Sequence, residues 1–416
     1  MRWSGKFGAG ERNFRARKSG SVRTPTVTEQ TRAMADSEHM ELSAFSHIDG
    51  AWSQAFPSLD SNQTMVLAFA ARSYDAHGDI LLELETAFPN SVVVGCSTSG
   101  EIDQMRIRDE SISVVAVRFS SARVRRAHTK LEATTGSFAA GTRIAEALED
   151  PDLRAVLVLS EGLHVNGSEL VRGLNTRLPE TVVVSGGLAG DGARFVKTWV
   201  LADGIPQPDC VVAVGLYGES LRITHGSQGG WDSFGPERTV TASTGNVLHA
   251  LDGRPALALY KEYLGERAAG LPGSALLFPL ALRESKEGSD SVVRTVLSVD
   301  EATQSLTFAG DVPKGHYAKL MRANFDRLIL GAQSAGHAAM GDHHGPTLSV
   351  AISCVGRRLV LGERTEEEIE ATLDSLPPGT TQVGFYSYGE LSPHTASGRC
   401  DLHNQTMTLT VISEAG

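Results

Sequence analysis

Small residues that follow short valine-rich runs are the first feature of this sequence that could carry chemistry. Residues 95–100 read Gly-Cys-Ser-Thr-Ser-Gly, residues 186–192 read Gly-Gly-Leu-Ala-Gly-Asp-Gly, and residues 384–390 read Gly-Phe-Tyr-Ser-Tyr-Gly-Glu. A thiol or hydroxyl where a strand ends, as at Cys96 and Ser97, has the position of a nucleophile. The segment is not Gly-x-Ser-x-Gly, however, and no order of His and Asp can be assigned to it. Catalysis by Cys96 or Ser97 is therefore the less favoured interpretation.

The glycines of residues 186–192 are also of a type that lets backbone amides approach an anion. A phosphate-binding loop needs a following Lys-Ser/Thr pair and a helix. The pair is missing here, and residues 195–200 are strand-like instead of helical. We interpret this segment as a turn that a ligand or a neighbouring loop can approach closely.

Two histidines adjoin glycine-rich or polar segments that end predicted strands. His225 begins His-Gly-Ser-Gln-Gly-Gly-Trp, ending at Trp231, and His403 lies in Leu-His-Asn-Gln-Thr-Met. An imidazole beside a bulky aromatic suits a flat, partly apolar ligand, and it can bind haem iron or donate to a carboxylate. A purely structural hydrogen bond is an equal alternative for each histidine.

The triplet Asp342-His343-His344 is the densest group of metal-binding residue types. It is similar to part of a phosphoesterase signature, but the further Asp and His motifs on separate strands are missing. A solvated loop is the favoured interpretation.

The elements that position these segments follow one repeated pattern of strand, helix, strand and small-residue loop. The pattern predicts three βαβ units, whose two strands must be parallel. The predicted first strands are 65–70, 155–159 and 348–354, and the predicted helices are 78–88, 167–178 and 365–376. We further expect a helix and linker over 36–61 and a helix over 316–339. The fold class is α/β, with two domains of mixed sheets, βαβ units, antiparallel hairpins and helices packed on the sheets.

Composition narrows the class of protein. The chain has 416 residues, 41% of them hydrophobic, and a net charge of -11, which argues against nonspecific nucleic-acid binding. No apolar run is long enough to span a bilayer, and four widely spaced cysteines favour a reducing, cytoplasmic location. Residues 1–34 carry eight basic and two acidic residues, which is typical of a disordered extension. We predict a basic tail and linker over 1–60 and domains over 61–250 and 251–416.

Five segments together resemble one known family of sensory proteins. These are Val-Gly-Cys-Ser-Thr-Ser-Gly-Glu-Ile at 94–102, Ser-Gly-Gly-Leu-Ala-Gly-Asp-Gly at 185–192, the segment 225–231, Gly-Phe-Tyr-Ser-Tyr-Gly-Glu-Leu at 384–391 and Leu-His-Asn-Gln-Thr at 402–406. Their types and order resemble the FIST proteins, which pair a FIST N domain with a FIST C domain. The resemblance covers about residues 61–413.

The resemblance implies a stand-alone sensor that binds a small ligand and regulates a separate histidine kinase or cyclic-dinucleotide enzyme, without catalysis. Some FIST proteins, called NosP, bind haem and respond to nitric oxide, so haem is a candidate cofactor. Among the histidines of this sequence, His225 is the first candidate axial ligand and His403 the second. The alternative is a sensor of a small metabolite, such as an amino acid, without haem. The residues that we predict to form the ligand pocket are Cys96, Ser97, Thr98, Gly187, Gly190, Asp191, His225, Trp231, Tyr386, Tyr388, His403 and Asn404.

Overall fold

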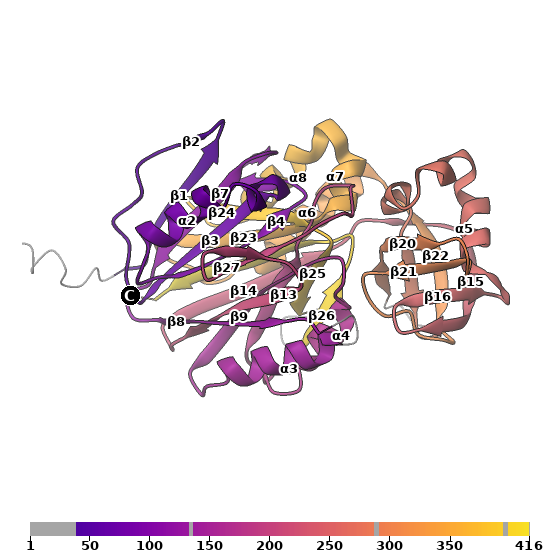
Figure 1. Cartoon of the computed structure of the whole chain (residues 1–416), viewed down its shortest axis with the longest axis horizontal. Coiled ribbons are helices and arrows are strands. Elements are labelled where there is room, and N and C mark those ends of the chain that lie inside the picture. Colours follow the sequence, from indigo (N-terminus) through magenta and orange to yellow (C-terminus); the bar gives the residue numbers. More distant parts are fainter. Residues whose placement is uncertain (1–38, 133–135, 287–290, 394–397, 416) are drawn as a thin grey trace, which may run out of the picture. The chain divides into compact units, whose positions relative to one another are not determined.

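The computed structural model describes residues 39–132, 136–286, 291–393 and 398–415 of the chain. The basic tail predicted over residues 1–34 lies outside this part. The fold is mixed α/β, as the sequence predicted, with helices packed on several mixed sheets (Figure 1). Among the described residues, no helix combines the length and the apolar character needed to cross a bilayer.

Three copies of one chain path build most of the described fold. In each copy, a parallel strand pair lies beside two antiparallel strands, and a hairpin follows the second parallel strand. The first copy contains β1 (Glu41–Ile48), β2 (Ala51–Trp52), β3 (Thr64–Ala71), η1 (Arg72–Asp75), α2 (Gly78–Ala87), β4 (Val92–Thr98), β5 (Glu101–Asp103), β6 (Arg106–Arg108) and β7 (Ile112–Arg118). The second contains β8 (Arg123–Lys130), α3 (Ser137–Leu148), β9 (Leu153–Ser160), α4 (Gly167–Leu174), β10 (Val183–Leu188), β11 (Val200–Ala202), β12 (Ile205–Gln207) and β13 (Cys210–Tyr217).

The third copy is interrupted after its first strand. It contains β14 (Leu221–Gln228), α6 (Phe325–Ala339), β23 (Thr347–Cys354), α7 (Val355–Leu361), η5 (Gly362–Arg364), α8 (Thr365–Leu373), β24 (Thr381–Ser387), β25 (Gly389–Pro393), β26 (Cys400–His403) and β27 (Met407–Glu414). The parallel pairs β3–β4, β9–β10 and β23–β24 confirm the three predicted βαβ units.

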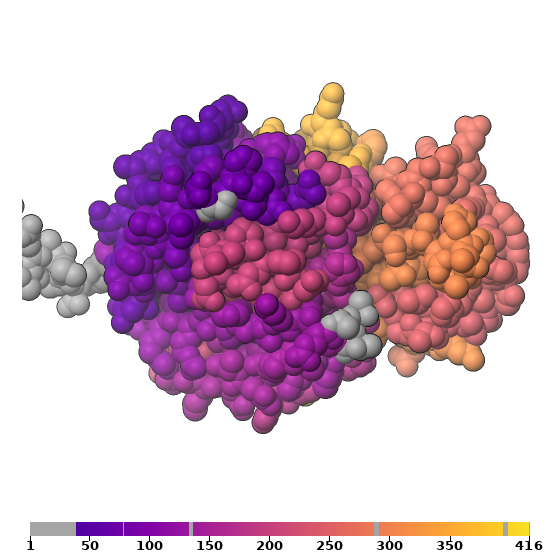
Figure 2. All heavy atoms as spheres, in the orientation of Figure 1, coloured from indigo at the N-terminus to yellow at the C-terminus, as the bar shows by residue number. Residues whose placement is uncertain are grey.

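Each copy places its hairpin on the sheet of another copy. Strand β5 pairs with β24, β11 pairs with β4, and β25 pairs with β10, so the exchange is cyclic. The three sheets consequently have equivalent strand orders: the exchanged hairpin comes first, then the parallel pair, then the two antiparallel strands. The orders are β12-β11-β4-β3-β7-β1, β26-β25-β10-β9-β13-β8 and β6-β5-β24-β23-β27-β14. In the space-filling view, residues 41–118 and 123–217 form one continuous surface (Figure 2).

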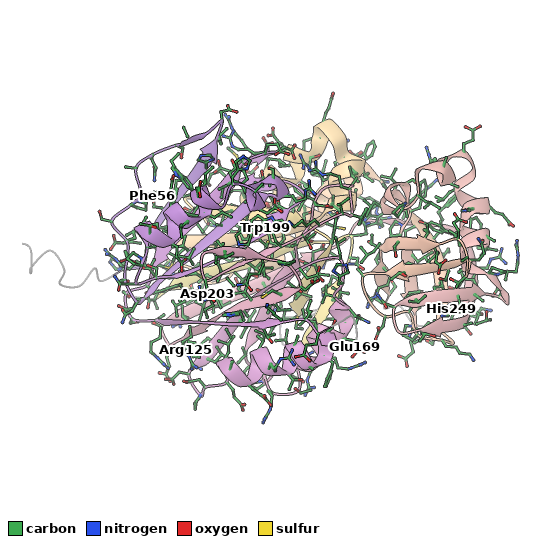
Figure 3. All side chains as sticks on the ribbon, in the orientation of Figure 1. Phe56, Arg125, Glu169, Trp199, Asp203 and His249 are labelled. Carbon is green, nitrogen blue, oxygen red and sulfur yellow. The ribbon has the colours of Figure 1, made fainter. Side chains whose placement is uncertain are left out.

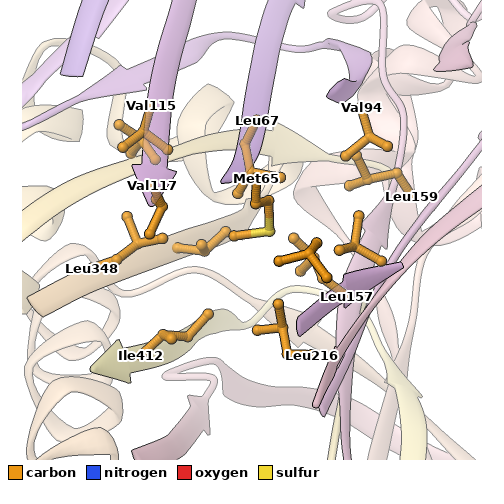
Figure 4. Packing of buried hydrophobic residues seen from close by; sticks show 14 of the residues in the cluster. Met65, Leu67, Val94, Val115, Val117, Leu157, Leu159, Leu216, Leu348 and Ile412 are labelled. Atoms are coloured by element: carbon orange, nitrogen blue, oxygen red, sulfur yellow. The ribbon is translucent and has the colours of Figure 1, made fainter. Parts of the chain in front are cut away.

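The central core lies where the three sheets face each other. Figure 4 shows Met65 and Val117 of the first copy together with Leu157 of the second and Ile412 of the third. All are buried, and the sheets bury apolar side chains on the faces that meet there. The strands are therefore held by one another as well as by the helices outside them.

The segment between β14 and α6 folds into a separate antiparallel lobe, here called the inserted lobe (residues 232–322). Its strands are β15 (Asp232–Thr244), β16 (Val247–Leu251), β17 (Arg254–Pro255), β18 (Leu280–Arg283), β19 (Val292–Arg294), β20 (Val296–Asp300), β21 (Ser305–Phe308) and β22 (Tyr317–Arg322). Its helices are α5 (Ala256–Leu264), η3 (Gly265–Gly270) and η4 (Gly273–Leu277). The lobe has its own apolar core, which includes Leu257 and Phe308.

Two of the expected helices are wrong, because strand pairing decides those segments. The helix expected over 36–61 is replaced by β1, which pairs along β7, and by β2. The helix expected over 316–339 is two elements, since β22 pairs with β15 and β18 and only α6 is helical. Neighbours distant in the sequence satisfy the backbone in both places, and helical spacing alone does not reveal them.

A buried ion pair ties the inserted lobe's two connections to the third copy. Arg357 and Glu368 are both fully buried, and the guanidinium donates to one carboxylate oxygen at 2.7 and 2.9 Å. Arg357 also donates to the carbonyls of Gly229 and Leu328, which lie on either side of the lobe in the sequence. Glu368 accepts from Tyr386 and Ser353, so both charges are paired inside the protein.

Replacing Arg357 should strongly destabilise the fold. The substitution Arg357→Met leaves the Glu368 carboxylate buried without its cation, which costs about 3–5 kcal/mol of unfolding free energy. The matched change Arg364→Met breaks only exposed pairs with Asp326 and Glu367 and should cost less than about 1 kcal/mol. Urea denaturation of both variants measures the difference, and equal losses would contradict this role of Arg357.

Candidate functional site

The loops that follow β4, β10 and β24 meet and form a closed cycle of backbone hydrogen bonds, here called the loop junction (residues 97–101, 188–192 and 386–390). The bonds run from Gly190 N to Ser97 O (3.0 Å), from Tyr388 N to Leu188 O (3.0 Å) and from Ser99 N to Tyr386 O (2.8 Å). Each loop thus contacts both others. The three similar sequence segments come together because the hairpin exchange brings the ends of their strands to one place.

Glycine is required in the loop junction where two loops touch. A Cβ at position 190 would overlap the hydroxyl oxygen of Ser99, which accepts from the amide of Gly192 at 2.9 Å. At position 187, a Cβ would lie 2.9 Å from Ile352 and 3.1 Å from Phe385. The close approach predicted for the segment 186–192 is therefore made by a neighbouring loop and by core side chains.

The acids that follow the glycines are buried and fully bonded. Glu101 accepts from Thr98 and from the amide and hydroxyl of Ser111. Glu390 accepts from Ser387 at 2.7 Å and from the amide and hydroxyl of Thr406. Glu101 thus joins the loop junction to Ser111, directly before β7, and Glu390 joins it to Thr406, directly before β27.

Asp191 has the corresponding position in the second loop, with different partners. It accepts from the amides of Phe195, Val196 and Lys197 and from the hydroxyl of Tyr388. The Tyr388 ring stacks on Phe195 with the ring centroids 4.7 Å apart. Asp191 therefore closes the loop between β10 and β11.

Burial changes the acidity of two of these carboxyls. Burial raises the pKa of Glu101 to about 7, although hydrogen bonds from Thr98 and Ser111 oppose the change. Burial likewise raises the pKa of Glu390 to about 7, against hydrogen bonds from Ser387 and Thr406. Each carboxyl keeps its proton to a higher pH in the folded protein than in the unfolded chain.

The proposed nucleophiles lie inside the protein. Cys96 and Ser97 are both fully buried, and burial raises the pKa of the Cys96 thiol well above its ordinary value. The Ser97 hydroxyl accepts from the amide of Trp199, which is itself buried (Figure 3). A substrate could reach neither group without opening the core, so this geometry does not favour the enzymatic alternative.

Of the remaining predicted site residues, Asn404 contacts the loop junction, because its amide nitrogen donates to Tyr388 O at 3.4 Å. Asn404 also joins the inserted lobe to the third copy, because its side-chain oxygen accepts from Thr295 N at 3.2 Å, and Trp231, which directly precedes the lobe, donates to Gln405 O at 3.1 Å. His403 is buried, and its Nε2 lies 3.0 Å from the carbonyl oxygen of Ser392. His225 lies within β14, which continues to Gln228, and not at a strand end. A ligand-binding role for these residues stays a prediction.

The histidine-rich triplet is only partly a solvated loop. Asp342 and His344 are exposed, but His343 is buried, with Nε2 2.7 Å from the Thr224 hydroxyl and Nδ1 2.8 Å from that of Ser413. Burial lowers the pKa of His343. The ring therefore bonds to both β14 and β27, which the sequence did not predict.

One cluster of metal-binding side-chain types lies elsewhere in the described part of the chain. The ligand atoms of Glu161, His164 and Asp209 lie within 4.8 Å of one another. Both oxygens of Glu161 already accept backbone amides, those of Leu163 at 3.0 Å and His164 at 2.7 Å. The Glu161 carboxylate therefore closes the turn that follows β9 by accepting from the turn's own amides.

A polar groove of about 430 Å³ opens beside the loop junction. Its lining includes Ser99, Gly192, Arg358, Glu363 and Glu366. Arg358 donates to the Ser99 carbonyl at 2.6 Å and binds both oxygens of Asp109 at 2.8 and 2.6 Å. The guanidinium lowers the pKa of the Asp109 carboxyl. Arg358, which contacts the loop junction, therefore shares an accessible groove with Glu363 and Glu366.

Sequence reasoning missed the charged residues Arg357, Arg358 and Glu368. The expected third helix began at Thr365, and the arginine pair that follows β23 was not interpreted. Two adjacent arginines within one helical turn of a buried strand were the available signal, because a charged residue at such a position needs a partner.

The contact at Gly190 can be tested by a compensating pair of substitutions. Gly190→Ala should lower the unfolding free energy by about 1–3 kcal/mol, because the new methyl group overlaps the Ser99 hydroxyl. Adding Ser99→Ala removes that oxygen and should recover part of the loss. Gly229→Ala is the control, since its Cβ would meet only an ordinary contact at 3.9 Å. Strictly additive losses in denaturant titrations would contradict the close approach.

The buried glutamates predict a specific dependence of stability on pH. Between about pH 4.5 and 7 the folded protein holds protons that the unfolded chain releases, so stability falls as pH rises through this window. The loss is up to about 3 kcal/mol for each glutamate. Glu101→Gln and Glu390→Gln cannot ionise, so the melting temperature of the double variant should change less between pH 5.5 and 8. The exposed Glu219→Gln should keep the original slope, and an unchanged slope in the double variant would refute the assignment.

Comparison with known proteins places this architecture in a family. The family model described as the FIST N domain matches residues 64–254, and that described as the FIST C domain matches residues 256–393, together more than half of the chain. Two Mycobacterium tuberculosis proteins, uncharacterized protein MT0656 of strain CDC 1551 and uncharacterized protein Rv0628c of strain H37Rv, are similar to it. Each is 23% identical over 361 residues, covering 84% of this chain and 91% of the relative. FIST domains are associated with sensory signal transduction. This chain belongs to the FIST family.

Proposed function

We propose that this protein senses a small zwitterionic metabolite, such as an amino acid, in the polar groove beside the loop junction. The observation that carries the proposal is Arg358, which lines the groove and also bonds to Ser99 of the junction. A guanidinium recognises a carboxylate through paired N–H donors. Glu363 and Glu366, which also line the groove, supply the negative charge that an ammonium group needs.

Binding can be coupled to the protein through Asp109. Its carboxylate forms an ion pair with the guanidinium of Arg358, and the Asp109 side chain is 67% exposed. A ligand carboxylate would compete with Asp109 for the same donors and release the turn between β6 and β7. We propose that this release is the signal passed to a separate partner, either a histidine kinase or a cyclic-dinucleotide enzyme.

The haem-binding, nitric-oxide-responsive version of a sensor is less well supported by this geometry. The linings of the polar groove and of the other three described pockets contain no histidine. His403 is buried against Ser392, and His225 is a half-buried residue of the edge strand β14, where its backbone pairs with Thr410. We therefore favour a sensor that binds its ligand without haem. A Soret band in haem-reconstituted protein that is lost in His225→Ala would reverse this preference.

Calorimetric titration with the common amino acids tests the proposal. At least one should bind, and Arg358→Gln should abolish its binding. Asp109→Asn should tighten binding roughly two- to fivefold, because it removes a competing exposed ion pair. Arg364→Gln, on the same segment but bonded to Asp326 and Glu367, should leave the affinity unchanged. The absence of binding by any amino acid, or unchanged binding in Arg358→Gln, would refute the proposal.

A further inference from the structure

A second groove, also of about 430 Å³, lies between the inserted lobe and the helices α6 and α7. We propose that it binds an amphipathic organic anion, with an apolar body and an acidic head, independently of the polar groove. Its lining includes Phe234, Phe278, Phe325, Leu359, Arg267 and Arg322. The volume lies within the range of about 300–1,000 Å³ that is usual for small-molecule sites.

The apolar part of the groove is open to solvent. Phe234 is 40% exposed, Phe325 is 46% exposed and Leu359 is 43% exposed. These side chains come from β15, α6 and α7, so the fold gathers them from three distant segments. Exposed large apolar side chains collected in one concave site indicate a surface that a ligand covers.

Two arginines give this apolar groove a positive rim. The guanidinium of Arg267 lies 5.3 Å from the ring centroid of Phe278, and that of Arg322 lies 6.0 Å from that of Phe234. Within the described residues, neither has a carboxylate partner or another hydrogen bond. Their donors are therefore available, held over the aromatic rings by cation–π contact. A chain of net charge -11 that leaves two guanidiniums unpaired at one groove favours an anionic ligand there.

Charge also decides between possible occupants. The N-terminal residues 1–34, with eight basic and two acidic residues, would meet a rim of the same sign. A purely apolar ligand would leave both guanidiniums without an acceptor. A small molecule with an acidic head satisfies both parts of the groove.

The groove adjoins the polar groove, because Leu359 lines both. Leu359 directly follows Arg358, which bonds to Ser99 of the loop junction. Arg357, in the same helix α7, binds the carbonyls on either side of the inserted lobe. A ligand between the lobe and α7 therefore contacts the helix that carries both arginines.

Fluorescence titration of the full-length protein tests this site with 8-anilinonaphthalene-1-sulfonate, an aromatic anion. Its neutral analogue, N-phenyl-1-naphthylamine, is the comparison probe. We expect one bound sulfonate probe per chain. The double variant Arg267→Gln/Arg322→Gln should weaken its binding by roughly threefold or more. The neutral probe should change by less than about twofold, because it lacks the charge that the arginines recognise.

Two further variants separate the possible outcomes. Phe234→Ala should weaken both probes, and Arg222→Gln, an exposed arginine on β14, should weaken neither. Unchanged sulfonate binding in both the double variant and Phe234→Ala would overturn the site. Sedimentation that shows a dimer dissociated by Phe234→Ala would also overturn it, since a second copy would then cover the groove. Amino-acid binding to the polar groove is measured separately, so either proposal can fail alone.

Discussion

Backbone hydrogen bonding at the loop junction is the constraint on which the arrangement of the three sheets depends. Three loops end in the interior, where water cannot satisfy their amides and carbonyls, and each obtains partners from the other two. The hydrogen bond from Gly190 N to Ser97 O brings these two loops together, and Ser99 then lies too close to position 190 for a side chain there. The loops can therefore exist in this form only together, which makes the junction a cooperative unit.

Polar side chains extend this unit outward and avoid uncompensated charge. Glu101 and Glu390 lie among hydroxyls and amides, where a neutral carboxyl can both donate and accept. Arg357 and Glu368 instead form a full ion pair, and their remaining hydrogen-bonding capacity is used by carbonyls and hydroxyls. On the surface side, Arg358 connects the same interior to an open groove. Ligand binding in the polar groove would therefore act on the loop junction through the hydrogen bond between Arg358 and Ser99.

The sequence predicted the local elements well because valine runs, early helical acids and prolines act over a few residues. The parallel pairs and the helices α2, α4 and α8 follow from these signals. It did not predict that β5, β11 and β25 each join another copy's sheet, because their partners are far away in the chain. For the same reason, His225 was expected at a strand end, although pairing with β27 extends its strand. The similar loops were identified as a group, but Arg358 and the grooves depend on tertiary contacts.

The cyclic exchange of hairpins also determines when the fold can be completed during synthesis. The hairpin β5–β6 pairs with β24, so Gln104 meets Gln382 across a separation of 278 residues. Until the last part of the chain leaves the ribosome, the first hairpin has no sheet to join, and the edge of β10 lacks β25. Contacts this distant in sequence slow folding and leave strand edges open in the nascent chain. The closed topology can therefore form only once residues 381–393 have been synthesised, and strand edges of the earlier segments stay open until then.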